Sequence, residues 1–436
     1  MKTDSTATRT LKTRTRSDWG WILALVLTIA TVSTGACQTA PPKPIEHAAQ
    51  AERPILILVS LDGWRWDYLD RAVTPRLNAL AASGVRSEGL IPQFPAKTFP
   101  SHYTIVTGLY PEHHGIVANN MLDATIGERF SMAAPTSRDS RWWGGEPLWV
   151  TAERQGHIAA SMFWPGSEVD IGGVRPSHWR PFVDATPNRE RVQQVLDWLQ
   201  LPELQRPSFL TLYFSTVDTI GHTFGPNSTE VLEAAAGLDE EIGALVDGVN
   251  ALGGLSSRVH YVIVSDHGMS ETANDRIVTL DDYINVDTVD IIGVSPVVGL
   301  WPRTDTVDHV YAALKDKHPS LSVYRREEVP AALHYNSNPR IPPIVTIADD
   351  GWSVGTQRQV SQWRNGTRSV GGNHGYDPSA KSMQGLLIAV GPQFRRGLII
   401  PPIENIHLYE MMAHVLGLRP AANDGDASAT TAMFRD

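Results

Sequence analysis

The sequence predicts an α/β fold in which helices cover both faces of a mostly parallel central sheet. Segments with helical periodicity alternate along the chain with short apolar runs, and the first run, Ile55–Leu61, is apolar at nearly every position. A strand that shows no polar alternation is typical of a sheet buried on both faces. Alternation of strands and helices is the pattern of parallel sheets joined by crossover helices.

The elements follow this alternation in order. The strand Ile55–Leu61 is followed by a helix at Thr74–Ala82, which stops at Gly84. Three further helices are each expected to precede a strand: Leu148–Arg154 before Ile158–Phe163, Arg189–Leu199 before Phe209–Phe214, and Glu230–Leu252 before Val259–Val264. A strand at Gly385–Val390 and a helix at Leu408–Leu416 complete the main body.

Residues 53–424 are expected to form one domain with an insertion. The periodicity weakens at about residues 292–343, apart from a helix at Val307–Lys317, and we interpret this stretch as an inserted cap. Residues 425–436 are mostly small and polar, so a flexible tail is expected there.

The first 37 residues have the features of a signal peptide. Basic residues precede the apolar run Trp19–Val32, which is shorter than the ~20 residues of a spanning helix. Cys37, the only cysteine, follows small residues in an arrangement that resembles a bacterial lipoprotein signal. This resemblance implies an exported, periplasmic protein anchored by lipid, with Gln38 favouring the outer membrane. An ordinary signal peptide and an uncleaved anchor are the alternatives, and the Pro-rich residues 38–52 are expected to be a linker.

Composition narrows the classes of function. The chain is 42% hydrophobic and 19% charged, values typical of a globular protein rather than a disordered or multi-span membrane protein. Its net charge of −10 gives no electrostatic reason to expect binding to a nucleic-acid duplex. A small anionic substrate is compatible with this charge if metal ions supply positive charge at the site.

Acidic and histidine side chains follow the predicted strands. Open α/β sheets bind ligands at the carboxyl ends of their strands, so these side chains are expected to converge. Singly, each has an ordinary explanation, as a helix cap or a core histidine. Together they form a mixed nitrogen and oxygen set that suits zinc or a similar borderline divalent metal, and two ions could share it. The set is Asp62, Asp218, His222, Asp266, His267 and, within a glycine-rich segment, His374.

A predicted helix start supplies a hydroxyl group. Thr98 precedes Phe99 and Pro100, which predicts that Thr98 is the N-cap of a helix. The same geometry favours a bound phosphate, because free backbone N–H groups and the positive end of the dipole meet there. A metal could activate the hydroxyl as a nucleophile. We expect the adjacent Lys97 to be solvated, and His102 to be structural or exposed.

With these motifs, the chain resembles the nucleotide pyrophosphatase/phosphodiesterase family of the alkaline phosphatase superfamily. The resemblance extends from about Pro54 to Asp424 and implies an alkaline phosphatase-like fold. It rests on six segments in the family's order: Leu61-Asp62-Gly63, Lys97-Thr98-Phe99-Pro100-Ser101-His102, Gly108-Leu109-Tyr110-Pro111 with His114-Gly115-Ile116-Val117, Asp218-Thr219-Ile220-Gly221-His222, Ser265-Asp266-His267-Gly268-Met269, and Gly372-Asn373-His374-Gly375.

The resemblance also implies a site and a reaction. It implies one Zn²⁺ held by Asp62, Thr98, Asp266 and His267, and a second held by Asp218, His222 and His374. Thr98 would attack phosphorus and form a phospho-threonine, so phosphate diesters or pyrophosphates of nucleotide type are the expected small-molecule substrates. Asn119 matches a residue that binds a phosphoryl oxygen, with Asn120 as the alternative by one position. Phe99 and Tyr213 match rings that stack on a nucleobase, and ordinary packing is the alternative.

Other functions remain open from sequence. Phosphomonoesterases, phosphonate hydrolases and phosphoglycerate mutases share the metal ligands. No arginine stands beside Thr98, however, and Asn119 favours the single charge of a diester. A sulfatase is disfavoured because its nucleophile is made from cysteine or serine. A non-catalytic, metal-binding surface lipoprotein is the alternative from another class. The physiological substrate and the oligomeric state are not predicted.

Overall fold

The computed structural model describes residues 53–364 and 370–435. The predicted signal peptide, with Cys37, and nearly all of the predicted linker lie outside the described residues. Within the described residues, no helix combines the length and the apolar character that crossing a membrane requires.

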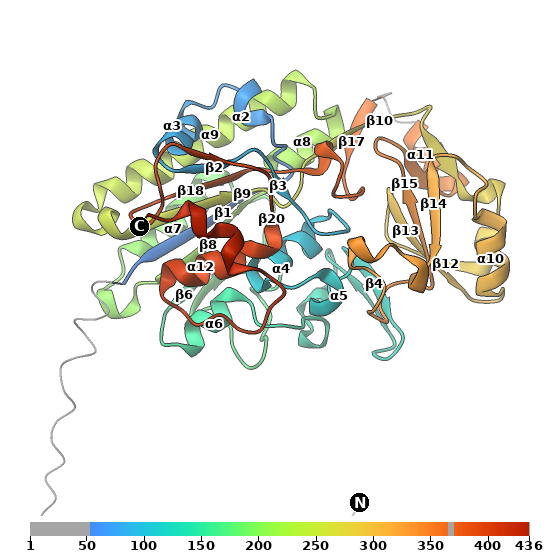
Figure 1. Ribbon diagram of the computed structural model, residues 1–436, viewed down its shortest axis with the longest axis horizontal. Coiled ribbons are helices and arrows are strands. Elements are labelled where there is room, and N and C mark those ends of the chain that lie inside the picture. Colours follow the sequence, from blue (N-terminus) through green and yellow to red (C-terminus); the bar gives the residue numbers. More distant parts are fainter. Residues whose placement is uncertain (1–52, 365–369, 436) are drawn as a thin grey trace, which may run out of the picture. The chain divides into compact units, whose positions relative to one another are not determined.

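An eight-stranded sheet forms the centre of the fold (Figure 1). The five strands from β9 to β7 are parallel to their neighbours, whereas β18 is antiparallel to both β9 and β2. The predicted mostly parallel α/β fold is therefore confirmed. In spatial order the strands are β19 (Leu398–Ile400), β2 (Val85–Ser87), β18 (Leu387–Val390), β9 (Val259–Val264), β1 (Ile55–Leu61), β8 (Phe209–Phe214), β6 (Ala159–Met162) and β7 (His178–Arg180).

Helices cover both faces of this sheet (Figure 1). Strand β1 is apolar on both faces, and its side chains alternate between two cores. Leu56 and Leu58 belong to one core, and Ile57 and Val59 belong to the other. The first core is closed by α4 (Thr98–Thr107), α6 (Leu148–Arg154) and α12 (Leu408–Leu416). The second is closed by α3 (Pro75–Ser83), α7 (Asn188–Leu199) and α9 (Thr229–Ala251).

Shorter elements build the loops around the sheet. Four short helices are α2 (Tyr68–Arg71), α5 (Pro111–His114), α8 (Thr216–Phe224) and α11 (Gln357–Arg364). Four two-stranded pairs are β3 (Leu90–Ile91) with β20 (Ile403–Glu404), β4 (Asn120–Asp123) with β5 (Glu128–Ser131), β10 (Ser270–Ala273) with β17 (Val370–Asn373), and β11 (Ile277–Thr279) with β16 (Ser353–Gly355).

A second, antiparallel sheet occupies the region of the predicted insertion. Its strands are β12 (Val289–Ile292), β13 (Val297–Pro302), β15 (Ile344–Ala348) and β14 (Leu321–Arg325), in that order. Helix α10 (Val307–Leu314) packs on this sheet and shares a separate small core with it. The predicted limits of 292–343 cut through β12 and omit β15. We refer to residues 289–348 as the insertion sheet, and its role as a cap stays a prediction.

The C-terminal residues are corrected from flexible to packed. A 3-10 helix, Ala427–Met433, begins after Asp426, whose carboxylate accepts from the Ser428 N–H. Met433 is buried in the main core, and the ring of Phe434 stacks on Phe394 at a centroid distance of 5.2 Å. Most residues around Met433 and Phe434 are small and polar, so the composition of this segment does not reveal that these two side chains pack.

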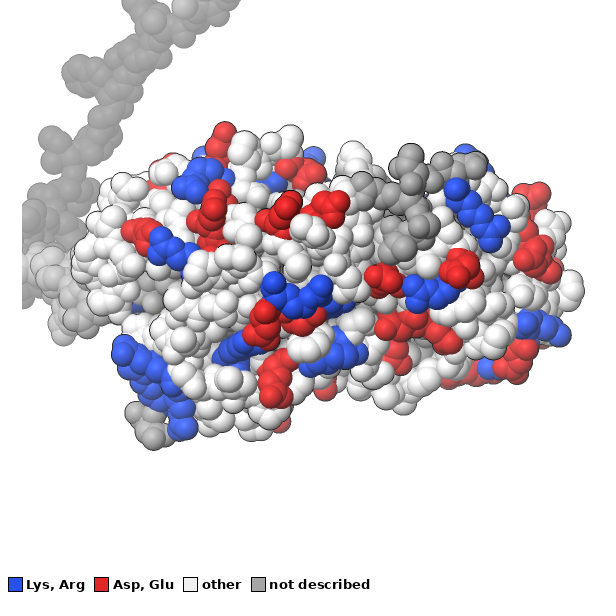
Figure 2. Space-filling model, turned by 90° about the horizontal axis from the view of Figure 1, so that it is seen from above, with Lys and Arg blue, Asp and Glu red and all other residues white. Residues whose placement is uncertain are grey.

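Charged side chains of both signs are interspersed on the face shown in Figure 2. On the described residues of that face, basic side chains do not gather into a continuous stripe.

Candidate metal centre

Three carboxylates meet where neighbouring parallel strands end. Asp62 follows β1, Asp266 follows β9, and Asp218 lies in the first turn of α8, directly after β8. The turn after β1 is tight, because Gly63 has a φ of +67° and a Cβ there would lie 2.8 Å from the Cα of Asp218. The Gly63 N–H also donates to Asp266 Oδ1 at 3.2 Å, which joins two strand ends.

Three imidazoles surround these carboxylates, each held by a backbone carbonyl. Because a carbonyl oxygen only accepts, each Nδ1 carries the hydrogen, and the opposite nitrogen, Nε2, is free to bind a cation. The donated bonds run from His222 to Gly372 O at 2.9 Å, from His267 to Gly268 O at 2.9 Å, and from His374 to Ala96 O at 2.8 Å.

Asp62, Asp266 and His267 form what we call the inner cluster. Nε2 of His267 lies 2.9 Å from Asp266 Oδ2 and 3.6 Å from Asp62 Oδ1. All three side chains are buried, with relative exposures of 0–1%.

Asp218, His222 and His374 form the outer cluster. Asp218 Oδ1 lies 3.4 Å from Nε2 of His222, one helical turn away, and 3.7 Å from Nε2 of His374. The backbone approach of β17 to α8 requires Gly372, since a Cβ there would lie 2.4 Å from Gly221 O. The His222 side chain is 39% exposed, so this cluster opens to solvent.

The two clusters are contiguous, and their atoms fit cations. The rings of His267 and His374 stack at 3.5 Å between centroids. Within the described part of the chain, Asp62 Oδ1, Asp218 Oδ1, Asp266 Oδ2 and His267 Nε2 are buried without a hydrogen-bond partner. Burial of each such atom without a partner lowers the stability of the fold by about 1–3 kcal/mol. Overlapping groups of three ligand atoms lie within 4.8 Å of one another here, so shared cations would satisfy them.

The electrostatics of both clusters also favour a cation. Burial raises the pKa of Asp62, and the charge of Asp266 raises it further. Burial acts to raise the pKa of Asp266 too, but His267 and His102 hold that pKa well below its usual value. Burial lowers the pKa of His374, which favours its neutral, metal-binding form.

Thr98 is the first residue of α4, and Lys97 is the N-cap. The N-cap residue precedes the first helical residue, and here that residue is Lys97, whose backbone is extended. The predicted capping role of Thr98 is therefore wrong by one position. Neither residue makes a side-chain cap, which leaves the Thr98 hydroxyl available for other contacts.

The backbone around Thr98 is tied to both clusters. Two residues before it, the Ala96 carbonyl accepts from His374 of the outer cluster. The Thr98 carbonyl accepts from His102 Nδ1 at 2.8 Å, and the same nitrogen lies 3.3 Å from Asp266 Oδ2 of the inner cluster. The helix start is thus positioned between the two groups of predicted ligands.

Asn119 lies beside this helix start. Its Oδ1 accepts from the Phe99 N–H at 2.9 Å, which leaves its NH₂ group to donate elsewhere. Asn120 instead begins β4, opposite Ser131. Phe99 is partly exposed and meets Phe130 edge-on at 5.9 Å.

Tyr213 does not have the role expected of it. It is buried in β8, and its hydroxyl donates to Asp62 Oδ2 at 2.6 Å. The stacking role is corrected, because this ring packs against His102 and holds a predicted ligand instead. The neighbouring exposed ring is Phe182, which is 44% exposed and lies 6.0 Å from Tyr213. The unbroken apolar pattern of Phe209–Phe214 could have indicated that Tyr213 is buried.

The expected solvation of Lys97 is wrong, whereas His102 has the structural one of its two expected roles. Lys97 is buried, not solvated; burial lowers its pKa to about 7, and its Nζ donates to Val294 O at 2.6 Å. His102 is buried as well, and its Nε2 lies 2.7 Å from Ser60 Oγ of β1. Val294 is 197 positions from Lys97, so no local signal could have found that contact.

Comparison with known proteins decides the family. Residues 56–377 match the model of the type I phosphodiesterase / nucleotide pyrophosphatase family. The chain belongs to this family. The family resemblance inferred from the six motifs is therefore confirmed.

Relatives within the type I phosphodiesterase family cover most of the chain. A venom phosphodiesterase of Crotalus durissus collilineatus is 37% identical over 88% of this chain and 47% of its own length. The chain spans about half the length of such venom relatives. An uncharacterized pyrophosphatase/phosphodiesterase of Schizosaccharomyces pombe is 38% identical over 87% of this chain and 80% of its own.

Solved structures of the family share the fold. Murine ectonucleotide pyrophosphatase/phosphodiesterase 5 superimposes with a TM-score of 0.83 at 32% identity, covering 88% of this chain and all of that one. That structure is an inactive threonine-to-alanine variant in complex with AMP. The human protein matches with the same TM-score at 33% identity.

Proposed function

We propose that this protein hydrolyses phosphate diesters or pyrophosphates of nucleotide type through a phospho-threonine at Thr98. The observation that carries the proposal is the convergence of six predicted ligands around the start of α4, with unpartnered buried atoms aimed at one another. A structural metal site would need no hydroxyl group at its edge, whereas a nucleophile must lie there.

The residues fit two zinc ions. Asp62, Thr98, Asp266 and His267 would hold one, and Asp218, His222 and His374 would hold the second. Carboxylate and imidazole donors without thiolates suit zinc better than calcium or magnesium. When bound, the ions would supply positive charge for the phosphate and lower the pKa of hydroxyl groups.

Thr98 and Asn119 would attack and orient the phosphate. The Thr98 oxygen attacks phosphorus, the bond to the departing oxygen breaks, and a threonine phosphodiester or monoester forms. Water then cleaves this ester and regenerates the hydroxyl. The Asn119 NH₂ group and the N–H of Thr98 donate to a non-bridging oxygen, where charge increases during attack.

One observation favours diesters over monoesters. Lys97, the basic residue adjacent to Thr98, directs its Nζ to Val294 O and not to the helix start. The complex of the murine relative with AMP supports a nucleotide-type ligand, but AMP is itself a monoester and does not decide this choice. A dianionic monoester would need additional cationic donors.

Substitution of Thr98 tests the proposal. Thr98→Ala should lower turnover of bis-p-nitrophenyl phosphate by at least about a thousandfold. Zinc content measured by elemental analysis should remain near that of the unmodified protein. Thr98→Ser, which keeps a hydroxyl, is the matched control and should retain measurable turnover.

Retained turnover in Thr98→Ala would exclude Thr98 as the nucleophile. Faster hydrolysis of p-nitrophenyl phosphate than of the diester would favour a phosphomonoesterase. Absence of both activities from zinc-loaded protein would favour a binding protein.

We also propose export to the periplasm with lipid attachment at Cys37. The support is the basic and apolar pattern before this single cysteine. Incorporation of labelled palmitate into the full chain, and its loss in Cys37→Ala, tests the attachment. Equal labelling of both chains would contradict it.

A further inference from the structure

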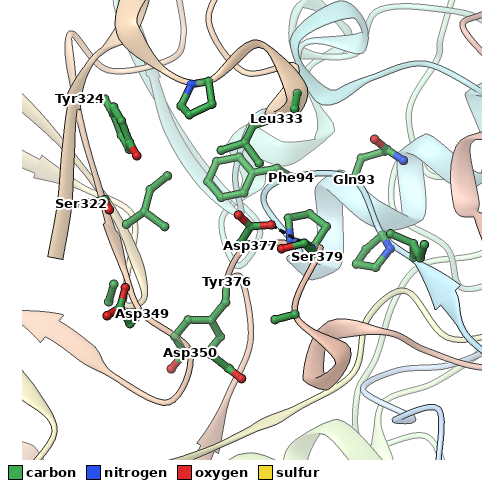
Figure 3. A pocket seen from close by; sticks show the side chains of 18 of the residues that line it. Gln93, Phe94, Ser322, Tyr324, Leu333, Asp349, Asp350, Tyr376, Asp377 and Ser379 are labelled. Atoms are coloured by element: carbon green, nitrogen blue, oxygen red, sulfur yellow. Dashed lines mark hydrogen bonds between the residues drawn. The ribbon is translucent and has the colours of Figure 1, made fainter. Parts of the chain in front are cut away.

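A cavity of about 490 Å³ lies between the main body and the insertion sheet (Figure 3). One wall is formed by residues 91–94 and 376–380, and the other by side chains of β14 and β15, such as Tyr324 and Ile347. None of the residues that line it belongs to the inner or outer cluster. The cavity is therefore separate from the proposed catalytic site.

The lining of this cavity is acidic. Four carboxylates, those of Asp349, Asp350, Asp377 and Glu404, line it, and among the described residues no lysine or arginine does. Lys315 lies near one wall, 5.3 Å from the ring centre of Tyr324, but its Nζ donates to the Val323 carbonyl. A hollow lined by charges of one sign concentrates ions of the opposite sign, so its occupant should be a cation.

The carboxylates are too dispersed for a metal ion. Among the described residues, groups of three acidic or histidine ligand atoms within 4.8 Å of one another occur only at the metal centre. The cavity carboxylates instead hold separate partners: Asp350 accepts from Ser382, Glu404 from Gln93, and Asp377 from the Ser379 N–H. Their arrangement suits several positive charges set apart from one another.

Apolar and aromatic groups lie between the carboxylates. Phe94, Leu333 and Tyr376 line the space from the side of the main body and the loop after β14, and Tyr324 faces them from β14 (Figure 3). Aromatic faces attract ammonium groups, and methylene chains pack on such surfaces. A hydrated inorganic ion would gain nothing from these side chains.

We propose that the cavity binds an aliphatic polyamine. Amines spaced along a flexible methylene chain match carboxylates that are separated by apolar surface. The occupant would contact Asp377, which follows His374 by three positions, and Phe94, which precedes Thr98 by four. It would thereby join the insertion sheet to both loops that enter the metal centre.

Calorimetry on the zinc-loaded, full-length protein tests this proposal, with spermidine as the probe. Asp349→Asn combined with Asp377→Asn should weaken binding about tenfold, since two charge contacts are lost. Asparagine retains the oxygen that accepts from Ser379, so the turn at residue 377 is preserved. Asp282→Asn with Asp316→Asn removes the same charge from exposed positions outside the cavity and should leave the affinity unchanged.

Three outcomes would overturn the proposal. The first is absence of spermidine binding at millimolar concentration. The second is an equal loss of affinity in the cavity variant and the exposed variant, which would reveal attraction to net charge alone. The third is displacement of spermidine by Mg²⁺ at equal concentration, which would indicate a site for any cation.

Discussion

The inner and outer clusters have the same kinds of ligand but differ in their surroundings. Around the inner cluster, Tyr213 donates to Asp62, and His102 and the Gly63 N–H contact Asp266. The outer cluster is held mainly by backbone carbonyls and leaves His222 partly in solvent. Under the proposed function, the inner side would fix the nucleophile, and the outer side would exchange substrate, product and water.

A matched pair of substitutions gives the largest expected contrast. Asp62→Asn and Asp218→Asn make the same chemical change at the ends of the adjacent strands β1 and β8. Loss of a metal that contributes several kcal/mol of charge stabilisation should lower turnover by about a thousandfold in each variant. Only Asp62→Asn should also lower the melting temperature of the zinc-loaded protein, because loss of the inner ion would leave Asp266 Oδ2 and His267 Nε2 buried without a partner, whereas His222 of the outer cluster faces solvent.

Calorimetric melting and elemental analysis of both variants provide the measurement. Each variant is expected to retain about one zinc equivalent, as the two clusters have separate ligands. Equal melting temperatures in the two variants would remove the distinction between a scaffolded inner site and an open outer one.

The convergence of the candidate ligands could be predicted from the sequence, because their positions follow from strand ends. Strands β1, β8 and β9 have the predicted bounds, since runs buried on both faces are apolar at nearly every position. Asp62, Asp218 and Asp266 then lie at the edge where parallel neighbours must meet. The apolar pattern of each strand and the topology of an α/β sheet are enough to predict this convergence.

The supporting contacts could not be predicted in the same way. Tyr213 reaches Asp62 across 151 positions, and Lys97 reaches Val294 across 197. Such partners are decided by tertiary packing, which leaves no periodic signal in either segment. The insertion sheet was bounded poorly for a related reason, because short antiparallel strands such as β12 lack a helical or extended apolar period.

Removal of the Tyr213 hydroxyl should have a smaller effect, confined to the inner cluster. Tyr213→Phe keeps the ring that packs against His102 but loses the 2.6 Å hydrogen bond to Asp62. Loss of a hydrogen bond to a metal ligand weakens metal affinity about tenfold. Competition with a chromogenic chelator should show one of two zinc ions released more easily.

The control for this variant is Tyr261→Phe, a buried tyrosine on β9, which is separated from β8 by β1. It should leave both zinc affinities unchanged. Weaker binding of both ions in Tyr213→Phe would show that the clusters are not independent.

The smallest expected effect concerns the rings near the open side of the centre. Phe99 is partly exposed and Phe182 is 44% exposed, so either can stack on a nucleobase, whereas Tyr213 is buried. Phe182→Ala should lower kcat/KM for p-nitrophenyl thymidine 5′-phosphate about tenfold, within the range of base–aromatic stacking. Phe99→Ala should act in the same direction.

The matched substrate for this test is methyl p-nitrophenyl phosphate, which has the same leaving group and no base. Its hydrolysis should be nearly unchanged in Phe182→Ala, and Val183→Ala, at the adjacent exposed position, should affect neither substrate. Equal losses on both substrates would mean that Phe182 supports the fold of the β7–α7 loop and does not contact the nucleoside. Selective loss on the nucleotide would instead assign base recognition to Phe182, which lies beside the tyrosine that supports the inner cluster.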